Sequence, residues 1–496
     1  MTNLGKYGDR KLGRKRSVPD MFTCAKIRNG GTYLGSHLTA NDYYCENEKV
    51  FGKWVGLAAE RLGIEGHIIG ADDAAFEALR QNRLPYGNDK LTPSRKEDGI
   101  RFFDFQCSAQ KSVSVMAVVM DDQRLYEAHD RASVKAFGEL ERFAAFRSGK
   151  SRNPEISGNL CASAFRHDAS RSLDPQIHTH FVAANATYDE KTNRWLALDT
   201  CEMFRAIRYA GKVYQNELAL ECRRLGYEIE HIRNNKGVIE GFEIAGVSEE
   251  IRKRYSKRRA EVEAGITRFQ NEKGRVPTTQ EISVITRETR NVKMSEIATP
   301  KVRDRQKAQL SPDELSALKA VKRQAVTKPG VGMDSAWKAV MRSVEHIFER
   351  KSVASGHEIM AEALNRNLGF IDLAALRRHM ESAYNGIIRL TRNEKNPLES
   401  SQWTSRRGLR LERYAIDFVN QTQDCCRPLG NIENVAFDFN SDEQRNAVFE
   451  TLNNRDRVYA IRGRAGTGKT TCLSEIRKGL EVNKGKPPRT TVPECW

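Results

Sequence analysis

The sequence lacks an apolar run long enough to cross a bilayer. Its longest apolar stretches, such as Val113 to Met120, are far shorter than the roughly 20 residues of a spanning helix. Its ten cysteines include no Cys-x-x-Cys pair and form no disulfide framework. The basic first twenty residues lack the apolar core and cleavage site of a secretory signal. We therefore expect a cytoplasmic protein with reduced thiols and no membrane insertion.

Acidic residues are in deficit. Lys and Arg number 82 against 65 Asp and Glu, which gives a net charge of +17. A surplus of this size predicts a polyanionic partner, with nucleic acid as the leading candidate. With 39% hydrophobic and 30% charged residues, the chain can bury substantial cores. Its 496 residues predict about three domains at roughly 150 residues each.

Composition and periodicity divide the chain into four predicted segments. These are a basic extension at 1–20, an α+β domain at 21–310, a mainly helical connecting region at 311–430 and the start of a phosphate-loop domain at 431–496. The strand-like runs of the second segment are 100–105, 112–119, 160–166 and 177–183. The predicted helices are 209–225, which ends at Gly226, then 359–368, which ends at Gly369, and 373–384.

Three histidines stand close together in the second segment. His167 ends one strand-like run, and His178 and His180 lie two positions apart in the next. Alternate residues of a strand point to the same face, so these two rings can converge on one ion. His167 can join them if the intervening turn folds the two strands into a hairpin. Three neutral imidazoles leave a metal with open positions for a phosphate, so the pattern predicts a catalytic metal site.

Tyrosines near the start of the same segment are candidate nucleophiles: Tyr33, Tyr43 and Tyr44. A phenol has a pKa near 10, so it needs a nearby base or cation to attack at neutral pH. Tyrosines at such positions are usually packing residues. Only the neighbouring histidine motif makes a nucleophilic role the favoured hypothesis.

Asp104 is a carboxylate inside an otherwise apolar strand-like run. Burying a charge is costly without a partner, so we expect one. The candidates are a histidine ring N–H, which Asp104 would orient, and an attacking tyrosine, whose proton it would take. A helix-capping or turn-stabilising role is the alternative.

Basic residues crowd one predicted helical stretch at 251–259. A solvated helix face and a phosphate-contacting surface are both consistent with this pattern. The candidate DNA-binding residues are Arg171, Arg252, Lys253, Arg254, Lys257 and Arg258.

A full phosphate-binding loop lies near the end of the chain, between a strand-like run at 458–461 and a predicted helix at 471–480. In such a loop, backbone amides cradle the phosphates, the lysine reaches the β- and γ-oxygens, and the hydroxyl helps to hold magnesium. The pattern therefore predicts a site for ATP with magnesium. Its residues are Gly463, Gly466, Gly468, Lys469 and Thr470.

Together these motifs resemble the TrwC/TraI-class conjugative relaxases, the MobF group of HUH-type endonucleases. The resemblance covers about residues 21–310, with departures at Leu34, where relatives often have tyrosine, and Gln110, where they often have proline. It is carried by Tyr33, Asp42 to Tyr44, Trp54 to Gly56, Asp104 with Ser108 to Ser114, and Arg166 to His180.

The resemblance implies an α+β fold in which an antiparallel HUH-type sheet is flanked by helices. It implies a divalent metal, magnesium or manganese with zinc as an alternative, on His167, His178 and His180. Tyr33 would be the first nucleophile and Tyr43 the second, with Tyr44 still open, and Asp104 would act as acid/base or orienting group.

The implied activity is site- and strand-specific nicking of single-stranded or hairpin transfer-origin DNA. The products are a 5′-phosphotyrosyl link and a free 3′-hydroxyl, which start plasmid or mobile-element transfer. Relaxosome and coupling proteins are the expected partners. The alternative is a non-catalytic remnant that binds origin or promoter DNA.

The phosphate loop, with Gln444 upstream, resembles the start of a RecD-like superfamily 1 helicase. Only 27 residues (496 − 469) follow Lys469, and they contain no Walker B carboxylate or second motor lobe. We therefore expect an incomplete P-loop α/β domain that binds nucleotide at most weakly and has no helicase activity.

Overall fold

The structure of the chain is a computed structural model. It describes residues 22–28, 52–70, 73–87, 89–93, 99–147, 153–170, 172–289, 299–327, 336–382, 386–390, 402–430, 435–464 and 466–481. The chain divides into two compact units, Met1–Thr404 and Ser405–Trp496, and each is described by itself. No helix in the described residues is long and apolar enough to cross a membrane.

A six-stranded antiparallel sheet organises the first unit, in the order β1-β4-β8-β7-β2-β3. The antiparallel α+β architecture predicted from the sequence is confirmed. The strands are β1 (Phe22–Ile27), β2 (Gly52–Val55), β3 (Ile68–Ile69), β4 (Phe102–Ser108), β7 (Ala162–Ala169) and β8 (Pro175–Ala184).

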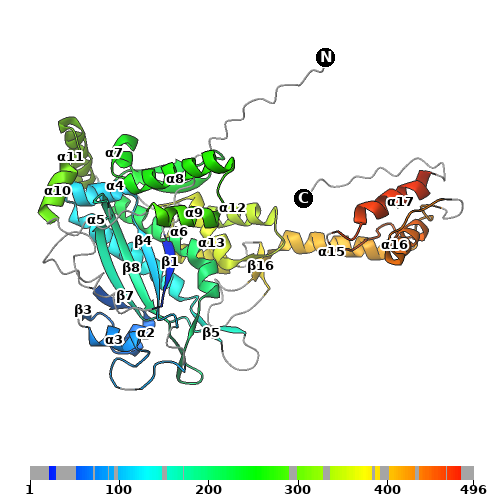
Figure 1. The fold of residues 1–496 in the computed structure, drawn as a ribbon, viewed down its shortest axis with the longest axis horizontal. Helices are drawn as coiled ribbons and strands as arrows, with labels where there is room; N and C mark the ends of the chain where they lie inside the picture. The colour runs from blue at the N-terminus through cyan, green and yellow to red at the C-terminus, as the bar shows by residue number, and fades with distance from the viewer. Residues whose placement is uncertain are drawn as a thin grey trace, which may run out of the picture. The chain divides into compact units, whose positions relative to one another are not determined.

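The two faces of this sheet have different surroundings. Side chains alternate along each strand, so Phe105 and Phe181 face one way, where the large core includes α5 (Gln123–Glu141) and α6 (Cys201–Arg224). The opposite face buries Phe102 and Phe165 in a smaller core with α2 (Leu57–Arg61) and α3 (Ala74–Arg80). Figure 1 shows α5 and α6 along the sheet, and α2 and α3 near β3.

The run at 112–119 is helical, so its prediction as a strand was wrong. It forms α4 (Lys111–Ser114) and a π-helical turn at Val115–Val119. Every residue of 112–119 is buried, so the alternation of Ser112 and Ser114 with valines does not mark a strand with one exposed face. The Ser112 and Ser114 hydroxyls accept the backbone N–H groups of Ile244 and Ile177.

The remaining elements of the first unit are small sheets and helices. The predicted helices at 209–225, 359–368 and 373–384 correspond to α6, α13 (Gly356–Arg366) and α14 (Leu373–Glu381), and Gly226 and Gly369 follow with positive φ. The other elements are β5 (Ala145–Arg147), β6 (Pro154–Ile156), β9 (Thr187–Asp189), β10 (Arg194–Leu196), β11 (Leu198–Asp199), β12 (Ile229–Arg233), β13 (Ile239–Ile244), α7 (Glu249–Arg254), α8 (Lys257–Lys273), α9 (Thr279–Glu288), α10 (Thr299–Lys307), α11 (Pro312–Thr327), α12 (Ala336–Phe348), β14 (Ala354–Ser355), β15 (Ile387–Arg389) and β16 (Gln402–Ser405).

The helices after residue 336 pack on α6 within the first unit. Asn216 on α6 donates to the Ile371 carbonyl at 2.8 Å and accepts the Gly369 N–H at 3.0 Å. Arg223 donates to the Gly369 carbonyl at 2.9 Å. The predicted boundaries at 311 and 431 remain predictions, and along the chain the first compact unit ends at Thr404.

The second unit has a small core of its own. Its helices are α15 (Arg406–Gln421), α16 (Asp442–Asn453) and α17 (Lys469–Glu481). Val448 and Leu452 on α16 pack with Cys472 and Ile476 on α17. The predicted strand at 458–461 is absent from the described residues of this unit, because a strand requires a hydrogen-bonded neighbour.

Candidate metal centre on the histidine hairpin

The three histidines lie on one hairpin, as the sequence predicts. β7 and β8 pair so that His167 lies directly opposite His178, and Phe165 opposite His180. Directly opposed residues of antiparallel strands share a face, so the three rings point to the same side of the sheet. The hairpin closes at Ser170, whose N–H donates to the Asp174 carbonyl at 2.9 Å.

The three rings form a compact cluster. The centroid of His167 lies 5.3 Å from that of His178 and 5.6 Å from that of His180, and the last two are 5.2 Å apart. All three side chains are buried. Among the described residues, no group of three or more His, Cys, Asp or Glu side chains is already arranged to hold a metal ion. Imidazoles are donors that divalent metals take, but the three rings as they lie do not form a metal site.

Two hydrogen bonds fix which nitrogen of each ring carries the proton. His180 Nδ1 lies 2.9 Å from both carboxylate oxygens of Asp104, and His178 Nδ1 lies 3.0 Å from the Gln176 carbonyl. An ionised carboxylate and a carbonyl only accept, so each Nδ1 is the donor. Nε2 then carries no proton in either ring, and it is the nitrogen that would coordinate a metal. The contact fits the orienting role predicted for Asp104, and that role stays a prediction.

Two polar residues for which the sequence predicted no role share this face. Gln106 lies opposite His180 and Ser108 opposite His178, and their side chains are 3.4 Å apart. The sequence could have indicated both residues, because positions 104, 106 and 108 of a strand point to the same face.

Buried polar contacts support the hairpin from the other face. His129 on α5 lies between the hydroxyls of Tyr214 and Thr179, each 2.8 Å away. Burial lowers the pKa of His129 to about 3, so the ring is neutral at physiological pH. Thr179 stands between two of the clustered histidines, so α5 and α6 both brace the strand that carries them.

Three other elements hold the turn of the hairpin. The Lys257 backbone N–H donates to Asp174 at 2.9 Å, and its ammonium group lies 3.3 Å from the same carboxylate. Gln306 donates to the Leu173 carbonyl at 2.8 Å. Lys111 donates to the Pro175 carbonyl at 2.9 Å, and burial lowers its pKa to about 8.

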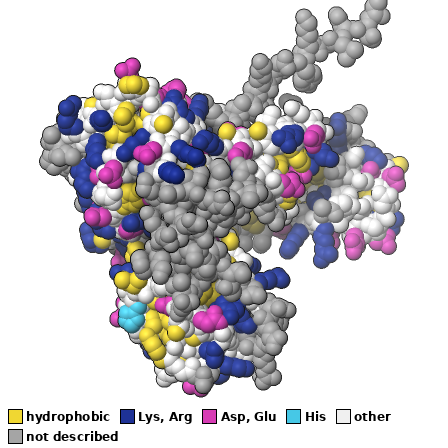
Figure 2. All heavy atoms as spheres, turned by 60° about the vertical axis from the view of Figure 1, so that its left-hand side comes forward, with side chains coloured by type: hydrophobic (Ala, Val, Ile, Leu, Met, Phe, Trp, Pro, Cys, Tyr) yellow, Lys and Arg dark blue, Asp and Glu magenta, His cyan; other side chains and the backbone are white. Residues whose placement is uncertain are grey.

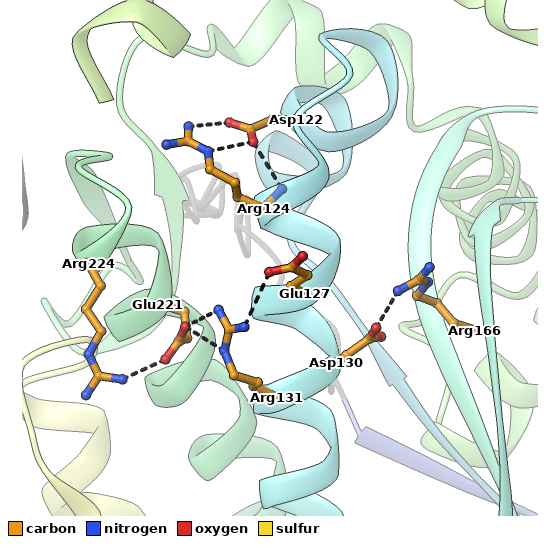
Figure 3. A network of polar contacts seen from close by, with 8 residues as sticks. All are labelled: Asp122, Arg124, Glu127, Asp130, Arg131, Arg166, Glu221 and Arg224. Atoms are coloured by element: carbon orange, nitrogen blue, oxygen red, sulfur yellow. Dashed lines mark hydrogen bonds and ion pairs between the residues drawn. The ribbon is translucent and has the colours of Figure 1, made fainter. Parts of the chain in front are cut away.

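An ion-pair network continues from the hairpin across α5 to α6 (Figure 3). Arg166, next to His167, pairs with Asp130 on α5. The next residue of the same helix, Arg131, joins Glu221 on α6 at 2.7 Å, and Glu221 also accepts from Arg224 at 2.6 Å. Most of these groups are partly exposed, so the network aligns the elements more than it stabilises them.

The basic stretch at 251–259 forms two helices, because α7 ends at Arg254 and α8 begins at Lys257. Its cations lie near carboxylates within the chain, and Arg258 also donates to the carbonyls of Thr286 and Thr289. The ion pairs are Arg252–Glu243, Lys253–Glu249, Arg254–Glu314, Lys257–Asp174 and Arg258–Glu261. Figure 2 likewise shows Lys and Arg interspersed with Asp and Glu on the visible face. DNA contact by these residues stays a prediction.

Four predicted site residues lie outside the described residues: Tyr33, Tyr43, Tyr44 and Arg171. Their roles stay predictions.

The phosphate loop lies in the second unit and leads into α17, which begins at Lys469. Gly466 and Gly468 adopt positive φ, which suits glycine. The Lys469 ammonium group donates to the carbonyls of Gly463 at 3.0 Å and Arg464 at 2.8 Å. Gln444 donates to the Thr467 carbonyl at 3.2 Å. The loop has the predicted connection to a helix but lacks the preceding strand.

Two family models match the chain. One is described as TrwC relaxase and matches residues 27–312, and the other is described as an AAA domain and matches residues 440–492. The first covers more than half of the chain.

Curated relatives match a shorter segment. The multifunctional conjugation protein TraI of Escherichia coli is 36% identical over 226 residues, which is 42% of this chain and 12% of that protein. The protein of the same description from strain K12 is 34% identical over 226 residues, with the same coverage. The match therefore spans about one eighth of the relatives' length.

A solved structure is also similar. It is a conjugative relaxase TrwC in complex with oriT DNA, in a copper-bound form. It is 26% identical with a TM-score of 0.50, and the match covers 60% of this chain and 99% of that one.

Proposed function

Because the chain belongs to the TrwC relaxase family, we propose that it nicks one strand of transfer-origin DNA by metal-dependent tyrosine transesterification. The observation that carries this proposal is the cluster of His167, His178 and His180, with His180 oriented by Asp104. The proposed substrate is single-stranded or hairpin DNA at the origin of a plasmid or other mobile element. The proposed partners are the proteins of its transfer machinery.

The three histidines would hold a divalent ion, with magnesium or manganese favoured and zinc as the alternative. Such an ion, when bound, polarises a scissile phosphate. The copper-bound TrwC structure supports a divalent metal at this fold. Within this chain, Asp104 and the Gln176 carbonyl keep the ring protons of His180 and His178 on Nδ1. Nε2 of each ring then carries no proton that would compete with a metal.

The proposed nucleophile is a tyrosine, Tyr33 first with Tyr43 or Tyr44 second. Its phenol oxygen forms a bond to the scissile phosphorus while the bond from phosphorus to the 3′-oxygen breaks. The phenol proton ends on the leaving 3′-oxygen, and the phosphate stays on the 5′ end as a phosphotyrosyl ester. The ester bond is exchanged and not hydrolysed, so rejoining needs no ATP.

Covalent adduct formation tests this proposal. The full chain is mixed with a labelled oligonucleotide from the origin of the element that encodes it, with Mn²⁺ or with a chelator. We expect a denaturation-resistant adduct with metal, its loss with chelator, and a tyrosine at the attachment site by peptide mass spectrometry. The exposed His67→Ala variant is the matched control and should form the adduct normally.

DNA binding without an adduct, under every metal tried, would overturn nicking and favour the binding-only alternative. An adduct on Tyr43 or Tyr44 with none on Tyr33 would keep the reaction and correct the order of the nucleophiles.

For the second unit we propose nucleotide binding at the phosphate loop. The AAA match at 440–492 and the positive φ of Gly466 and Gly468 support it. Lys469 would exchange its two carbonyl acceptors for phosphate oxygens.

A further inference from the structure

A cavity of about 790 Å³ opens in the first unit, away from the histidine cluster. Its wall is built from the N-terminal turns of α6, the C-terminal end of α12, the start of α13 and β14, with Gln402 from β16. None of its lining residues belongs to β4, β7 or β8. The volume lies within the roughly 300–1,000 Å³ of ordinary ligand sites.

The carboxylates of the wall are already paired. Glu202 accepts from Arg205 at 2.5 Å, Glu358 from Lys351 at 2.8 Å, and Glu362 from Arg366 at 2.9 Å. Each of these negative charges therefore has its own cation. A cationic ligand would find no carboxylate free to receive it.

Two guanidinium groups of the wall are left over. Arg208 on α6 and Arg350 after α12 are exposed, and neither has a carboxylate partner among the described residues. A guanidinium presents several donors in a planar fork that matches phosphate oxygens. The wall also contains His346 and His357 as further polar rings and Val353 as an exposed apolar surface.

We propose that this cavity binds the phosphodiester backbone of single-stranded DNA. The proposal rests on the proposed function, since a nicked strand must be held while it is displaced. The guanidinium groups of Arg208 and Arg350 both line this one cavity, and the phosphates of a flexible single strand can be contacted by two such groups at once.

Binding of a labelled twelve-residue oligo(dT) to the full chain tests this site, because this DNA contains no origin hairpin. Fluorescence anisotropy compares the wild type with Arg208→Glu/Arg350→Glu. The matched control is Arg268→Glu/Lys319→Glu, which makes the same charge change at two exposed residues outside the cavity lining. Thermal unfolding verifies that each variant is folded, and Arg208→Gln/Arg350→Gln replaces the charge reversal if that variant is not.

We expect the Kd of the cavity variant to rise more than tenfold and that of the control to change less than twofold. The salt dependence of log K should lose about 1.4 in slope, the value for two phosphate contacts on a single strand. Equal losses in both double variants, or no loss in either, would overturn the cavity as a strand site. The adduct assay on the wild type tests nicking separately, so failure of one proposal does not decide the other.

Discussion

The histidine hairpin lies in the middle of a six-stranded sheet, whereas the phosphate loop follows a segment that forms no strand in the described residues. Three elements hold the hairpin turn, and His129 braces it from the opposite face. The phosphate loop is exposed, and Lys469 donates to carbonyls of its own loop.

The difference lies in the structure around each motif. A metal site requires ligands whose rotamers are fixed by packing and by hydrogen bonds from neighbouring residues, and the residues around the hairpin provide both. In the second unit, the core beneath the loop consists mainly of the contact between α16 and α17. A complete sequence motif therefore predicts a functional site only where the surrounding residues also hold its side chains in place.

The largest effect is expected from removing one of the clustered histidines. His178→Ala should lower adduct formation at limiting metal more than 100-fold, beyond the roughly 10–100-fold typical of losing an outer partner of a metal ligand. DNA binding should persist within a few fold. Gel analysis of adducts over a range of Mn²⁺ concentrations measures the first, and anisotropy measures the second. Full nicking by this variant at limiting metal would make these histidines ordinary strand residues.

The orienting carboxylate gives the next largest effect. Asp104→Asn keeps an acceptor for His180 Nδ1 but removes the negative charge, so metal affinity should fall about 10- to 100-fold. Isothermal titration with Mn²⁺ measures it, with the exposed Asp313→Asn as control. An unchanged affinity would assign Asp104 a purely structural contact.

The scaffold of the sheet should be sensitive to pH through Glu141. Burial raises the pKa of this carboxyl from 4.5 to about 7, and its Oε1 atom accepts the N–H groups of Leu57 and Leu160. The folded state then binds more protons than the unfolded state between these two pKa values, so the free energy of unfolding falls as the pH rises through that window.

Glu141→Gln keeps an oxygen for both N–H groups without the charge. Relative to the wild type, it should gain about 3 kcal/mol in unfolding free energy between pH 4 and pH 8. Urea unfolding of the variant at both pH values measures this gain, and the exposed Glu272→Gln is the control. A difference that does not vary with pH would contradict the raised pKa.

A smaller gain in unfolding free energy is expected from replacing Gln110. Its side chain is 1% exposed, neither amide atom has a hydrogen-bond partner among the described residues, and it makes no capping bond to α4. Gln110→Met should raise the unfolding free energy by about 1 kcal/mol, because an unsatisfied buried amide is destabilising. Denaturant unfolding measures this, with the exposed Gln280→Met as control. A loss of stability would mean that the amide is satisfied in solution.

The smallest effect on nicking is expected from a substitution in the phosphate loop. Lys469→Ala should abolish weak nucleotide binding, measured with a fluorescent ATP analogue, and change adduct formation less than twofold. A tenfold loss of nicking would show that the phosphate loop serves the histidine centre.

Local periodicity was sufficient to predict the hairpin but not every element around it. The two-residue spacing of His178 and His180 fixed their common face, and the isolated charge of Asp104 implied a nearby partner. Residues 112–119 were predicted as a strand from the alternation at Ser112 and Ser114, but the run is helical and buried on every side. The residue that each basic side chain contacts depends on distant segments, as with Arg254 and Glu314, and no local pattern encodes it.

Pulsed electron paramagnetic resonance of the Cu²⁺-loaded full chain tests the central claim most directly, because it detects the remote nitrogens of coordinated imidazoles. We predict one bound ion per chain with three imidazole ligands, and one fewer in each of the variants His167→Ala, His178→Ala and His180→Ala. The His67→Ala control should give the wild-type spectrum. A spectrum that none of the three substitutions changes would contradict a metal centre on the histidine hairpin.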